Sequence, residues 1–524
     1  MSPAAKKKKS AKKKPSGGGK KIKRLLIANR GEIAVRIIRT CREMGIETVA
    51  VFSDADRSSM HVQLADYAYE VGKGPSSESY LLMDRILDVA KKSKADAVHP
   101  GYGLLSENVV FAKACEDAGI IFVGPPSSAI TEMGNKTAAR TAALAAKVPV
   151  VPGSPQSYED CAQAFAYAKK MKFPVLIKAV SGGGGRGMRV VENEKEFQNA
   201  FESAAREAKS AFGDGRLYLE RYLKNPRHVE IQILADRKGN CVYLGERECS
   251  IQRRHQKIFE ETPSPVLTPA MRRAMGDAAV RASKKVGYVN AGTVEFLVAK
   301  EGKQQKFYFI EMNTRLQVEH PVTEMATGLD LVALQLRIAQ GEPLPFNQKA
   351  IQPKVCALEA RICAEDPEEN YRPSPGKISS VRWPLGPYVR IDSHVYDGYE
   401  IPMFYDPMIA KIITWGDDRP TVIRRMIRAL REIQIQGIKT NISQLLAVLN
   451  DADFQKGNMH INFLRDKEMF GEAVDKSTLD WVAALTVMMD IEGSGTNVAQ
   501  SGSIRNKKIN VSPWKRMIGM WREP

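Results

Sequence analysis

The apolar run at Phe309-Ile310 ends in a dense group of reactive side chains: Glu311, Asn313, Arg315, Glu319 and His320. Carboxylate and amide oxygens are the ligands that Mg²⁺ prefers, and a guanidinium can hold a planar anion through two hydrogen bonds. A strand that only supports a core would not end this way. The segment therefore predicts a metal-nucleotide site that faces a second anionic substrate.

A glycine-rich loop upstream supplies a complementary feature. Lys178 is followed closely by four consecutive glycines, 182–185, and the β-prone stretches 173–178 and 188–191 flank this loop. A P-loop would instead carry G-x-x-x-x-G-K-[ST] ahead of a helix, so the pattern disfavours that class. A glycine hairpin can close over phosphates as a lid because no side chains obstruct its N–H groups.

Two acidic residues are expected to face each other across a second hairpin. The stretches 293–298 and 306–311 flank a polar turn at 301–305. A turn centred on residue 303 places Glu295 opposite Glu311. Two facing carboxylates repel each other unless a cation lies between them, which again indicates a metal.

The beginning of the folded part reads as a βαβ unit. A short apolar strand at 24–28 precedes a helix with Ile33, Ile37 and Ile38 on one face, and a second strand follows at 48–52. The connecting turn has one glycine instead of G-x-G-x-x-G, so we expect a Rossmann-like fold that does not bind NAD. With 524 residues the chain has room for about three or four domains.

Charge and cysteine content narrow the class of protein. The net charge is +18, but residues 1–24 hold eleven Lys and Arg and no acid, leaving +7 for the rest. We therefore expect a disordered Lys-rich tail at 1–21 and do not expect nucleic acid as a partner. The seven cysteines are scattered and contain no C-x-x-C, which predicts a reducing compartment. No apolar run is long enough for a membrane span, so we expect a cytoplasmic location.

The chain resembles the biotin carboxylase family from about residue 23 to 466. The resemblance rests on the motifs IANRGEIAVRIIR, HPGYGLLSEN, KAVSGGGGRGMRVV, NPRHVEIQ, ECSIQRRHQK, FIEMNTRLQVEHPVTEM and ARICAEDP. It implies a mixed α/β and α+β multidomain fold: a Rossmann-like domain at 22–134, an ATP-grasp domain at 135–352 with its lid at about 151–223, and a C-terminal domain at 353–466. The segment 467–524 does not match the family, and we expect it to be a linker with a partner-docking tail.

The resemblance also implies a reaction. ATP and bicarbonate would give carboxyphosphate, and the carboxyl group would then pass to N1′ of biotin carried on another protein. For the nucleotide it implies a set of ATP-binding residues: Lys136, Lys178, Gly184 and Gly185 in the lid, the hinge Glu220, Arg221, Tyr222 and Leu223, and the histidines His228 and His255.

The remaining roles follow from the same resemblance. Glu295, Glu311 and Asn313 would hold two Mg²⁺ ions, for which Mn²⁺ could substitute. Lys257, Arg315, Gln317 and the Val318 N–H would hold bicarbonate. Glu319 would take the bicarbonate proton, with its pKa raised by its surroundings, and Arg361 would stabilise the negative ureido oxygen of biotin.

The partners are expected on other chains. No Ala-Met-Lys-Met biotinylation motif occurs, and too few residues follow Asp466 for a carrier and a carboxyltransferase. A biotin carboxyl carrier protein and a carboxyltransferase are therefore expected as separate subunits, and the family implies a homodimer. Two alternatives stay open: another ATP-grasp ligase that makes an acyl-phosphate, and a non-catalytic scaffold.

Overall fold

The N-terminal part of the chain is built on a five-stranded sheet. A computed structural model describes residues 20–180, 187–254, 256–302 and 304–469, all within one compact unit, and for Lys136 and Phe212 it describes the backbone alone. The sheet is parallel throughout, in the order β3-β2-β1-β4-β5. Its elements are β1 (Arg24–Ile27), α1 (Gly31–Glu43), β2 (Glu47–Ser53), α2 (Met60–Leu64), β3 (Tyr67–Gly72), α3 (Met83–Lys92), β4 (Ala97–His99), α4 (Val109–Asp117), β5 (Ile121–Phe122) and α5 (Ser127–Gly134).

This sheet confirms the predicted βαβ opening. Leu25, Leu26 and Ile27 are all fully buried, as expected for a central parallel strand covered on both faces. Helix α1 buries Ile33, Ile37 and Ile38 against the sheet. The polar loop after β1 is thereby held at the carboxyl end of the strand.

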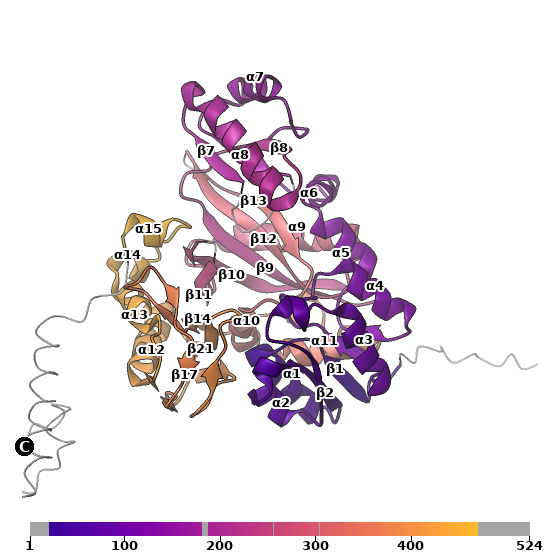
Figure 1. Ribbon diagram of the computed structural model, residues 1–524. Helices are drawn as coiled ribbons and strands as arrows, with labels where there is room; N and C mark the ends of the chain where they lie inside the picture. The colour runs from indigo at the N-terminus through magenta and orange to yellow at the C-terminus, as the bar shows by residue number, and fades with distance from the viewer. Residues whose placement is uncertain (1–19, 181–186, 255, 303, 470–524) are drawn as a thin grey trace, which may run out of the picture. The chain divides into compact units, whose positions relative to one another are not determined.

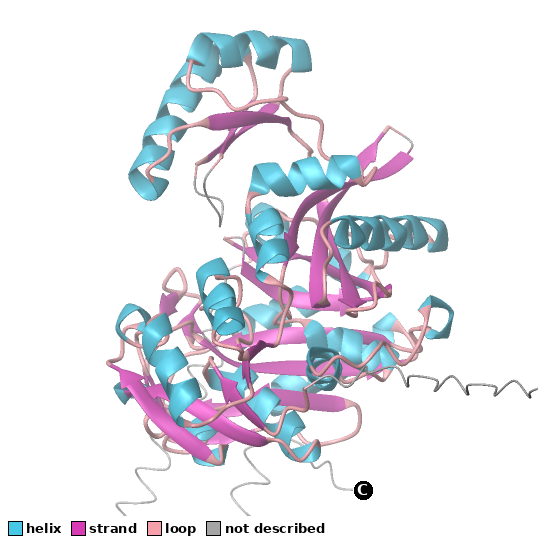
Figure 2. Cartoon of the chain, turned by 90° about the vertical axis from the view of Figure 1, so that its right-hand side faces the viewer, coloured by secondary structure: helices cyan, strands magenta, loops and turns pink. Residues whose placement is uncertain are grey.

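The segment expected to form the lid is a small layer of its own. Strands β6 (Val175–Ala179) and β7 (Met188–Val191) pair antiparallel, with Lys178 opposite Met188, and β8 (Leu217–Arg221) pairs with β6 on its other side. Helices α7 (Cys161–Met171) and α8 (Phe197–Phe212) pack on this three-stranded sheet, and α6 (Lys136–Ala145) precedes it (Figure 2). The hairpin on both sides of the glycine loop is thus confirmed, while Gly184 and Gly185 lie outside the described residues.

An eight-stranded sheet forms the centre of the molecule, in the order β13-β12-β9-β10-β11-β14-β21-β19 (Figure 1). All of its pairings are antiparallel. Its first part comprises β9 (Arg227–Ala235), β10 (Cys241–Arg253), β11 (Gln256–Thr262), β12 (Asn290–Glu301) and β13 (Gln304–Asn313), with helices α9 (Pro269–Lys285), α10 (His320–Thr327) and α11 (Leu331–Ala339).

The sheet continues without a break into the segment expected to be the C-terminal domain, because β11 pairs with β14. This segment contains β14 (Cys356–Cys363), β15 (Glu365–Asp366), β16 (Arg372–Pro373), β17 (Gly376–Lys377), β18 (Ser380–Arg382), β19 (Val389–Ser393), β20 (Glu400–Ile401), β21 (Met408–Gly416), β22 (Gln434–Gln436), α12 (Arg419–Glu432), α13 (Ile442–Asn450), α14 (Ala452–Gln455) and α15 (Phe463–Asp466). Its core joins Ile258 and Phe259 of β11 to Ile412 of β21.

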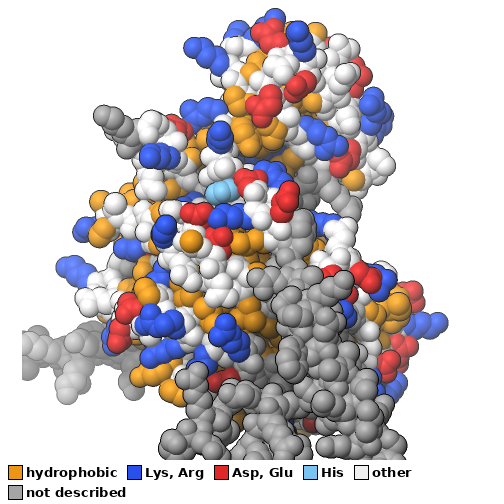
Figure 3. All heavy atoms as spheres, turned by 90° about the vertical axis from the view of Figure 1, so that its left-hand side faces the viewer, with side chains coloured by type: hydrophobic (Ala, Val, Ile, Leu, Met, Phe, Trp, Pro, Cys, Tyr) orange, Lys and Arg blue, Asp and Glu red, His pale blue; other side chains and the backbone are white. Residues whose placement is uncertain are grey.

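The described surface carries both signs of charge. On the face shown in Figure 3, acidic and basic side chains are interspersed. Among the described residues, no helix is both long and apolar enough to cross a bilayer. All seven cysteines lie in the described part and are free thiols.

Candidate functional site

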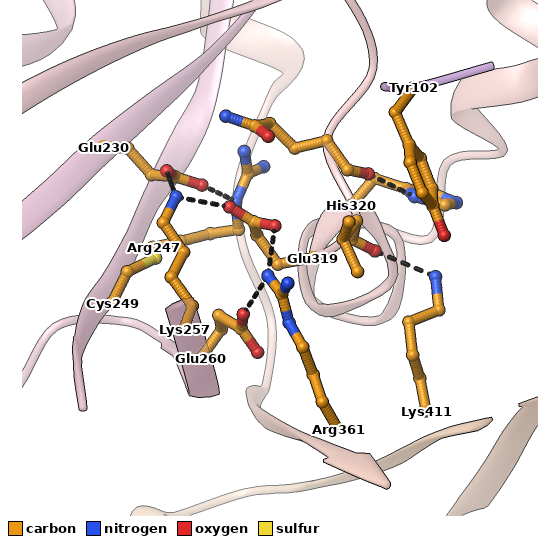
Figure 4. A network of polar contacts seen from close by, with 12 residues as sticks. Tyr102, Glu230, Arg247, Cys249, Lys257, Glu260, Glu319, His320, Arg361 and Lys411 are labelled. Carbon is orange, nitrogen blue, oxygen red and sulfur yellow. Dashed lines mark hydrogen bonds and ion pairs between the residues drawn. The ribbon is translucent and has the colours of Figure 1, made fainter. Parts of the chain in front are cut away.

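A row of charged residues crosses four neighbouring strands of the large sheet. Arg247 on β10 pairs in register with Glu230 on β9, Glu230 pairs with Glu295 on β12, and Glu295 pairs with Glu311 on β13. Directly paired residues point to the same face of a sheet, so the row brings three carboxylates side by side. Figure 4 shows the cations that contact one of them, Glu230.

The predicted pairing of Glu295 with Glu311 is confirmed, although the hairpin contains a bulge that the sequence did not predict. Its turn pairs Glu301 with Gln304, and a register shift lies between Glu295 and Phe296. Ile310 is the extra residue on β13 at this point. A bulge re-aims side chains locally, and both Ile310 and Glu311 line the cavity described below.

Lys257 of β11 contacts two carboxylates of the row, Glu230 and Glu295, and also Glu319 in the turn before α10. Its Nζ lies 2.6 Å from Glu230 Oε2, 2.6 Å from Glu319 Oε1 and 3.1 Å from Glu295 Oε1. Burial lowers the pKa of this lysine, but the carboxylates outweigh burial and raise it well above its usual range. Lys257 is therefore a fixed cation at the junction of the row and the turn before α10.

His228 completes the charge balance at Glu295. Its Nε2 lies 3.1 Å from Glu295 Oε2, and its Nδ1 contacts Gln252 Nε2 at 2.8 Å. Burial lowers the pKa of His228, yet the Glu295 carboxylate raises it overall. For Glu295 the direction is opposite: burial raises its pKa, but Lys257 and His228 hold it well below its usual range.

Glu319 is clamped between two cations. Its Oε2 accepts a hydrogen bond of 2.8 Å from Arg361 Nη2 on β14, while Oε1 faces Lys257. Arg361 also forms an ion pair with Glu260 of β11, and its Nε has no hydrogen-bond partner among the described residues. The base and the arginine named from the sequence are thus in direct contact (Figure 4).

The expectation that the pKa of Glu319 is raised is wrong. Burial acts in that direction, but Lys257, Arg361 and Arg247 outweigh it and hold the pKa well below its usual range. The raised pKa belongs to a neighbour: burial raises the pKa of Glu260 to about 7 although Arg361 opposes this. Glu319 is consequently ionised at neutral pH and can accept a proton.

Arg315 and Gln317 form the next part of the site. Arg315 Nη1 donates to Gln317 Oε1 at 2.8 Å, and its Nη2 donates to Asn313 Oδ1 at 3.2 Å. Its Nε donates to Glu107 Oε2 at 3.0 Å, which fixes the guanidinium from the N-terminal domain. Asn313 in turn donates to Glu295 at 2.9 Å, so its amide joins the arginine to the acidic row.

These groups open into one cavity of about 1090 Å³. Its lining contains many of the residues named from the sequence: Lys178, Glu220, His228, Lys257, Glu295, Glu311, Asn313, Arg315, Gln317, Val318, Glu319 and Arg361. Lys178 and Glu220 form an ion pair on neighbouring lid strands. A volume of this size accommodates ligands as large as a nucleotide with a second small substrate.

Some of the named residues are not part of this lining. Arg221 turns its side chain to Glu301 and Tyr308, and its backbone N–H donates to Pro152 O at 2.8 Å. Tyr222 and Leu223 are also absent from the lining, and Leu223 is buried beside Val151. His255 and the side chain of Lys136 lie outside what the structure describes.

The structure adds residues that the sequence interpretation did not name. Glu230, Glu260 and Arg247 are buried in the charge network, and Glu107 holds Arg315. Glu230 could have been found, because it lies two residues after His228 in a strand and so shares its face. Lys411 could not, since only the folded structure brings it to the turn before α10.

Comparison with known proteins agrees with this architecture. The family model described as "Biotin carboxylase, N-terminal domain" matches residues 21–130, "Carbamoyl-phosphate synthase L chain, ATP binding domain" matches 135–347, and "Biotin carboxylase C-terminal domain" matches 359–466. Biotin carboxylase 1 of Bacillus subtilis is 51% identical over 450 residues, which cover 86% of this chain and 100% of that protein.

Longer relatives match over part of their length. The alpha subunit of mitochondrial methylcrotonoyl-CoA carboxylase from Rattus norvegicus is 51% identical over 447 residues, 84% of this chain, and the chain spans 62% of that relative. The chain also spans 62% of the equivalent subunit from Mus musculus.

Solved structures extend the agreement to three dimensions. The biotin carboxylase domain dimer of Hydrogenobacter thermophilus 2-oxoglutarate carboxylase, in complex with MgADP, ADP and bicarbonate, superposes with a TM-score of 0.82 at 45% identity, covering 87% of this chain and 100% of that one. Biotin carboxylase from Campylobacter jejuni superposes with a TM-score of 0.82 at 46% identity, covering 85% of this chain and 99% of that one. The chain belongs to the biotin carboxylase family.

Proposed function

We propose that this chain is a biotin carboxylase subunit that uses ATP and bicarbonate to carboxylate biotin on a carrier protein. The observation that carries the proposal is the contact of Glu319 with both Lys257 and Arg361 at the wall of a single large cavity. In this arrangement the proposed base, Glu319, contacts both Lys257, which would bind bicarbonate, and Arg361, which would bind biotin. The same cavity contains the acidic row and the lid lysine.

The nucleotide is assigned to the part of the cavity lined by Lys178, Glu220 and His228. Lys178 stays charged because, although burial lowers its pKa, the neighbouring Glu220 raises it overall. A charged ammonium is a strong hydrogen-bond donor to phosphate oxygens. Lys136, Gly184, Gly185 and His255, together with the hinge 220–223, remain predicted nucleotide-binding residues.

The donor set suits magnesium. Glu295 and Glu311 are facing carboxylates on paired strands, and hard oxygen donors of this kind fit Mg²⁺. Bound there, the ion would offset the charge of the triphosphate during phosphoryl transfer. Glu295 is kept ionised by Lys257 and His228, so it is ready to bind a cation without losing a proton.

Bicarbonate is assigned to the surface formed by Lys257, Arg315, Gln317 and the Val318 N–H. Glu319 would accept its proton as the oxygen attacks the γ-phosphoryl group, giving carboxyphosphate and ADP. Carboxyphosphate then yields its carboxyl group to N1′ of biotin, and the released phosphate takes up the N1′ proton. Arg361 would stabilise negative charge on the ureido oxygen through a hydrogen bond in a buried site.

The partners proposed are a biotin carboxyl carrier protein and a carboxyltransferase on separate chains, and a second copy of this chain. The dimeric state of the Hydrogenobacter domain supports the last of these. The relatives are named for methylcrotonoyl-CoA, pyruvate and 2-oxoglutarate carboxylases, so similar chains serve acceptors of different chemistry.

The test is bicarbonate-dependent ATP hydrolysis by the purified chain with Mg²⁺, with and without free biotin. We expect ADP release to need bicarbonate and to rise with biotin, and Arg361→Ala and Glu295→Gln to abolish the rise. Matched surface controls are Arg372→Ala and Glu342→Gln, whose side chains are 71% and 44% exposed. ATP turnover indifferent to both bicarbonate and biotin would instead support another ATP-grasp ligase.

A further inference from the structure

Lys411 of β21 is a fully buried lysine with an unusual set of partners. Its Nζ donates to the Val318 carbonyl at 2.8 Å and lies 3.0 Å from Glu32 Oε1. Asp392 is more distant, at 3.8 Å, and already has its own pair of hydrogen bonds from Arg390. A carboxylate alone would balance the charge, so the bond to a backbone carbonyl calls for a separate explanation.

The carbonyl belongs to the turn that carries the reactive groups. Gln317, Val318 and Glu319 are consecutive and all line the cavity, immediately before α10 begins at His320. The peptide that joins Val318 to Glu319 is planar, so fixing its oxygen also fixes the direction in which the chain enters Glu319. Figure 4 shows Lys411 reaching this turn from the side opposite Lys257.

Lys411 also belongs to the same sheet row as Arg361. The two residues pair in register between β21 and β14, and Asp392 pairs with Lys411 from β19. On the other side, Glu32 comes from the first turn of α1, and the Tyr102 hydroxyl donates to it. Lys411, beside Arg361 in the large sheet, thus links helix α1 to the turn before α10.

We propose that Lys411 is a positioning residue for the carboxylation reaction, holding the turn 317–319 through the Val318 carbonyl so that Gln317, the Val318 N–H and Glu319 face bicarbonate together. This inference rests on the proposed function. Lys411 touches no reacting atom in this scheme. It acts through the geometry of the turn, and displacement of a reacting group by about 1 Å can cost about 10²-fold in rate.

The competing explanation is that Lys411 only neutralises Glu32. Three variants separate the two: Lys411→Met, Glu32→Gln and the double variant Glu32→Gln/Lys411→Met. The double variant removes both charges and leaves Asp392 with Arg390 and the buried Glu359 with Arg361, so no buried carboxylate loses its sole cation. It also guards against failure of the single Lys411→Met variant to fold.

Bicarbonate-dependent ATP hydrolysis by the full chain supplies the test, with bicarbonate and ATP varied separately and thermal melting followed in parallel. We expect the double variant to show kcat/KM for bicarbonate at least about tenfold below that of Glu32→Gln, with KM for ATP changed less than about twofold. Lys411→Arg, which keeps a donor for the carbonyl, should recover part of the loss.

Two results would overturn the inference. If the double variant matches Glu32→Gln in kcat/KM for bicarbonate, Lys411 serves only to balance charge. If KM for ATP and kcat/KM for bicarbonate worsen equally along with the melting temperature, its role is only structural. Both differ from failure of the proposed function itself, in which the unaltered chain would hydrolyse ATP without needing bicarbonate.

Discussion

The Glu319 carboxylate is ionised and paired with the side chains of Lys257 and Arg361. Its lowered pKa makes it a weak base that is unprotonated at neutral pH. We expect Glu319→Gln to lower bicarbonate-dependent kcat by about 10²-fold or more, because the amide cannot accept the proton. The measurement is ADP release at saturating ATP and bicarbonate. KM for ATP should change little, since Glu319 faces Lys257 and Arg361 and not the lid.

The surface variant Glu342→Gln is the matched control for this substitution. Unaltered turnover in Glu319→Gln, with the control also unaltered, would exclude Glu319 as the base. Glu260 would then become the next carboxyl to test, because it contacts the same arginine.

Buried histidines make the stability of the fold sensitive to acid. Burial lowers the pKa of His99 from 6.5 to about 4, so the unfolded chain binds a proton below about pH 6.5 that the folded chain refuses until about pH 4. Stability is therefore lost as the pH falls through this window, by about 3 kcal/mol for this residue. His99→Gln should flatten the dependence of unfolding free energy on pH between 7 and 4.5.

The less buried His460 provides the comparison for His99. His460→Gln should change the pH dependence less, because partial exposure leaves its pKa closer to the ordinary value. Equal slopes in the His99 variant and the unaltered chain would contradict the prediction.

The placement of single residues was predictable where they share a local motif. Their pKa values were not predictable where these depend on charges from distant parts of the sequence. The spacing of Glu311, Asn313 and Arg315 placed them at the end of one strand, and the structure brings all three to the cavity. The direction of the Glu319 pKa was missed, because Lys257 and Arg361 come from β11 and β14, and their distances to Glu319 exist only after folding.

Strands β9 and β12 and the turn before α10 depend on Lys257 to keep Glu230, Glu295 and Glu319 together. Lys257→Met should destabilise the fold by about 3–5 kcal/mol, because it leaves buried carboxylates without their shared cation. Calorimetric melting of the purified variant measures this loss. Adding Glu295→Gln should recover part of it by removing one of the repelling groups.

The double variant also provides the decisive comparison for the acidic row. If Lys257→Met/Glu295→Gln melts at or below the temperature of Lys257→Met, repulsion across the row is not the cause of the loss. Lys306→Met serves as a control, because Lys306 pairs with Glu301 at the exposed end of the same hairpin.

Elements followed the sequence pattern except where a short irregularity intervened. The turn is centred between residues 302 and 303 and not on 303, and the bulge at Ile310 restores Glu311 as the partner of Glu295; this bulge has no period-2 signature that could reveal it. Strand β17 ends at Lys377 and β18 begins at Ser380, and Ile378 between them is fully buried in the core.

The largest sheet crosses the boundary expected at residue 352. Strand β11 bonds to β14, and Phe259 packs in the core with residues of β21. Cleavage at a protease site introduced near 352 should therefore leave two fragments that remain associated in gel filtration without denaturant. Separation into a folded 353–466 fragment would show that the sheet is not needed for folding.

The order of the segments was predictable from the sequence, and the continuity of the large sheet was not. The βαβ pattern, the glycine loop and the family motifs indicated the Rossmann-like, lid and C-terminal segments, but strand pairing between β11 and β14 depends on three-dimensional contact between segments about 100 residues apart. The positive charge of residues 1–24 lies mostly outside the described residues, whose visible surface is mixed in sign.

The shared sheet also limits how chains of this kind can be recombined by protein engineers. A chimaera joined near residue 352 would place a foreign β14 against the resident β11, and its inward residues would have to match Phe259 and the carboxylate Glu260. Random exchange at that point would mostly yield insoluble hybrids. Crossovers placed before Arg227 or after Gly416 leave every strand pair of this sheet intact, so productive hybrids should concentrate outside residues 227–416.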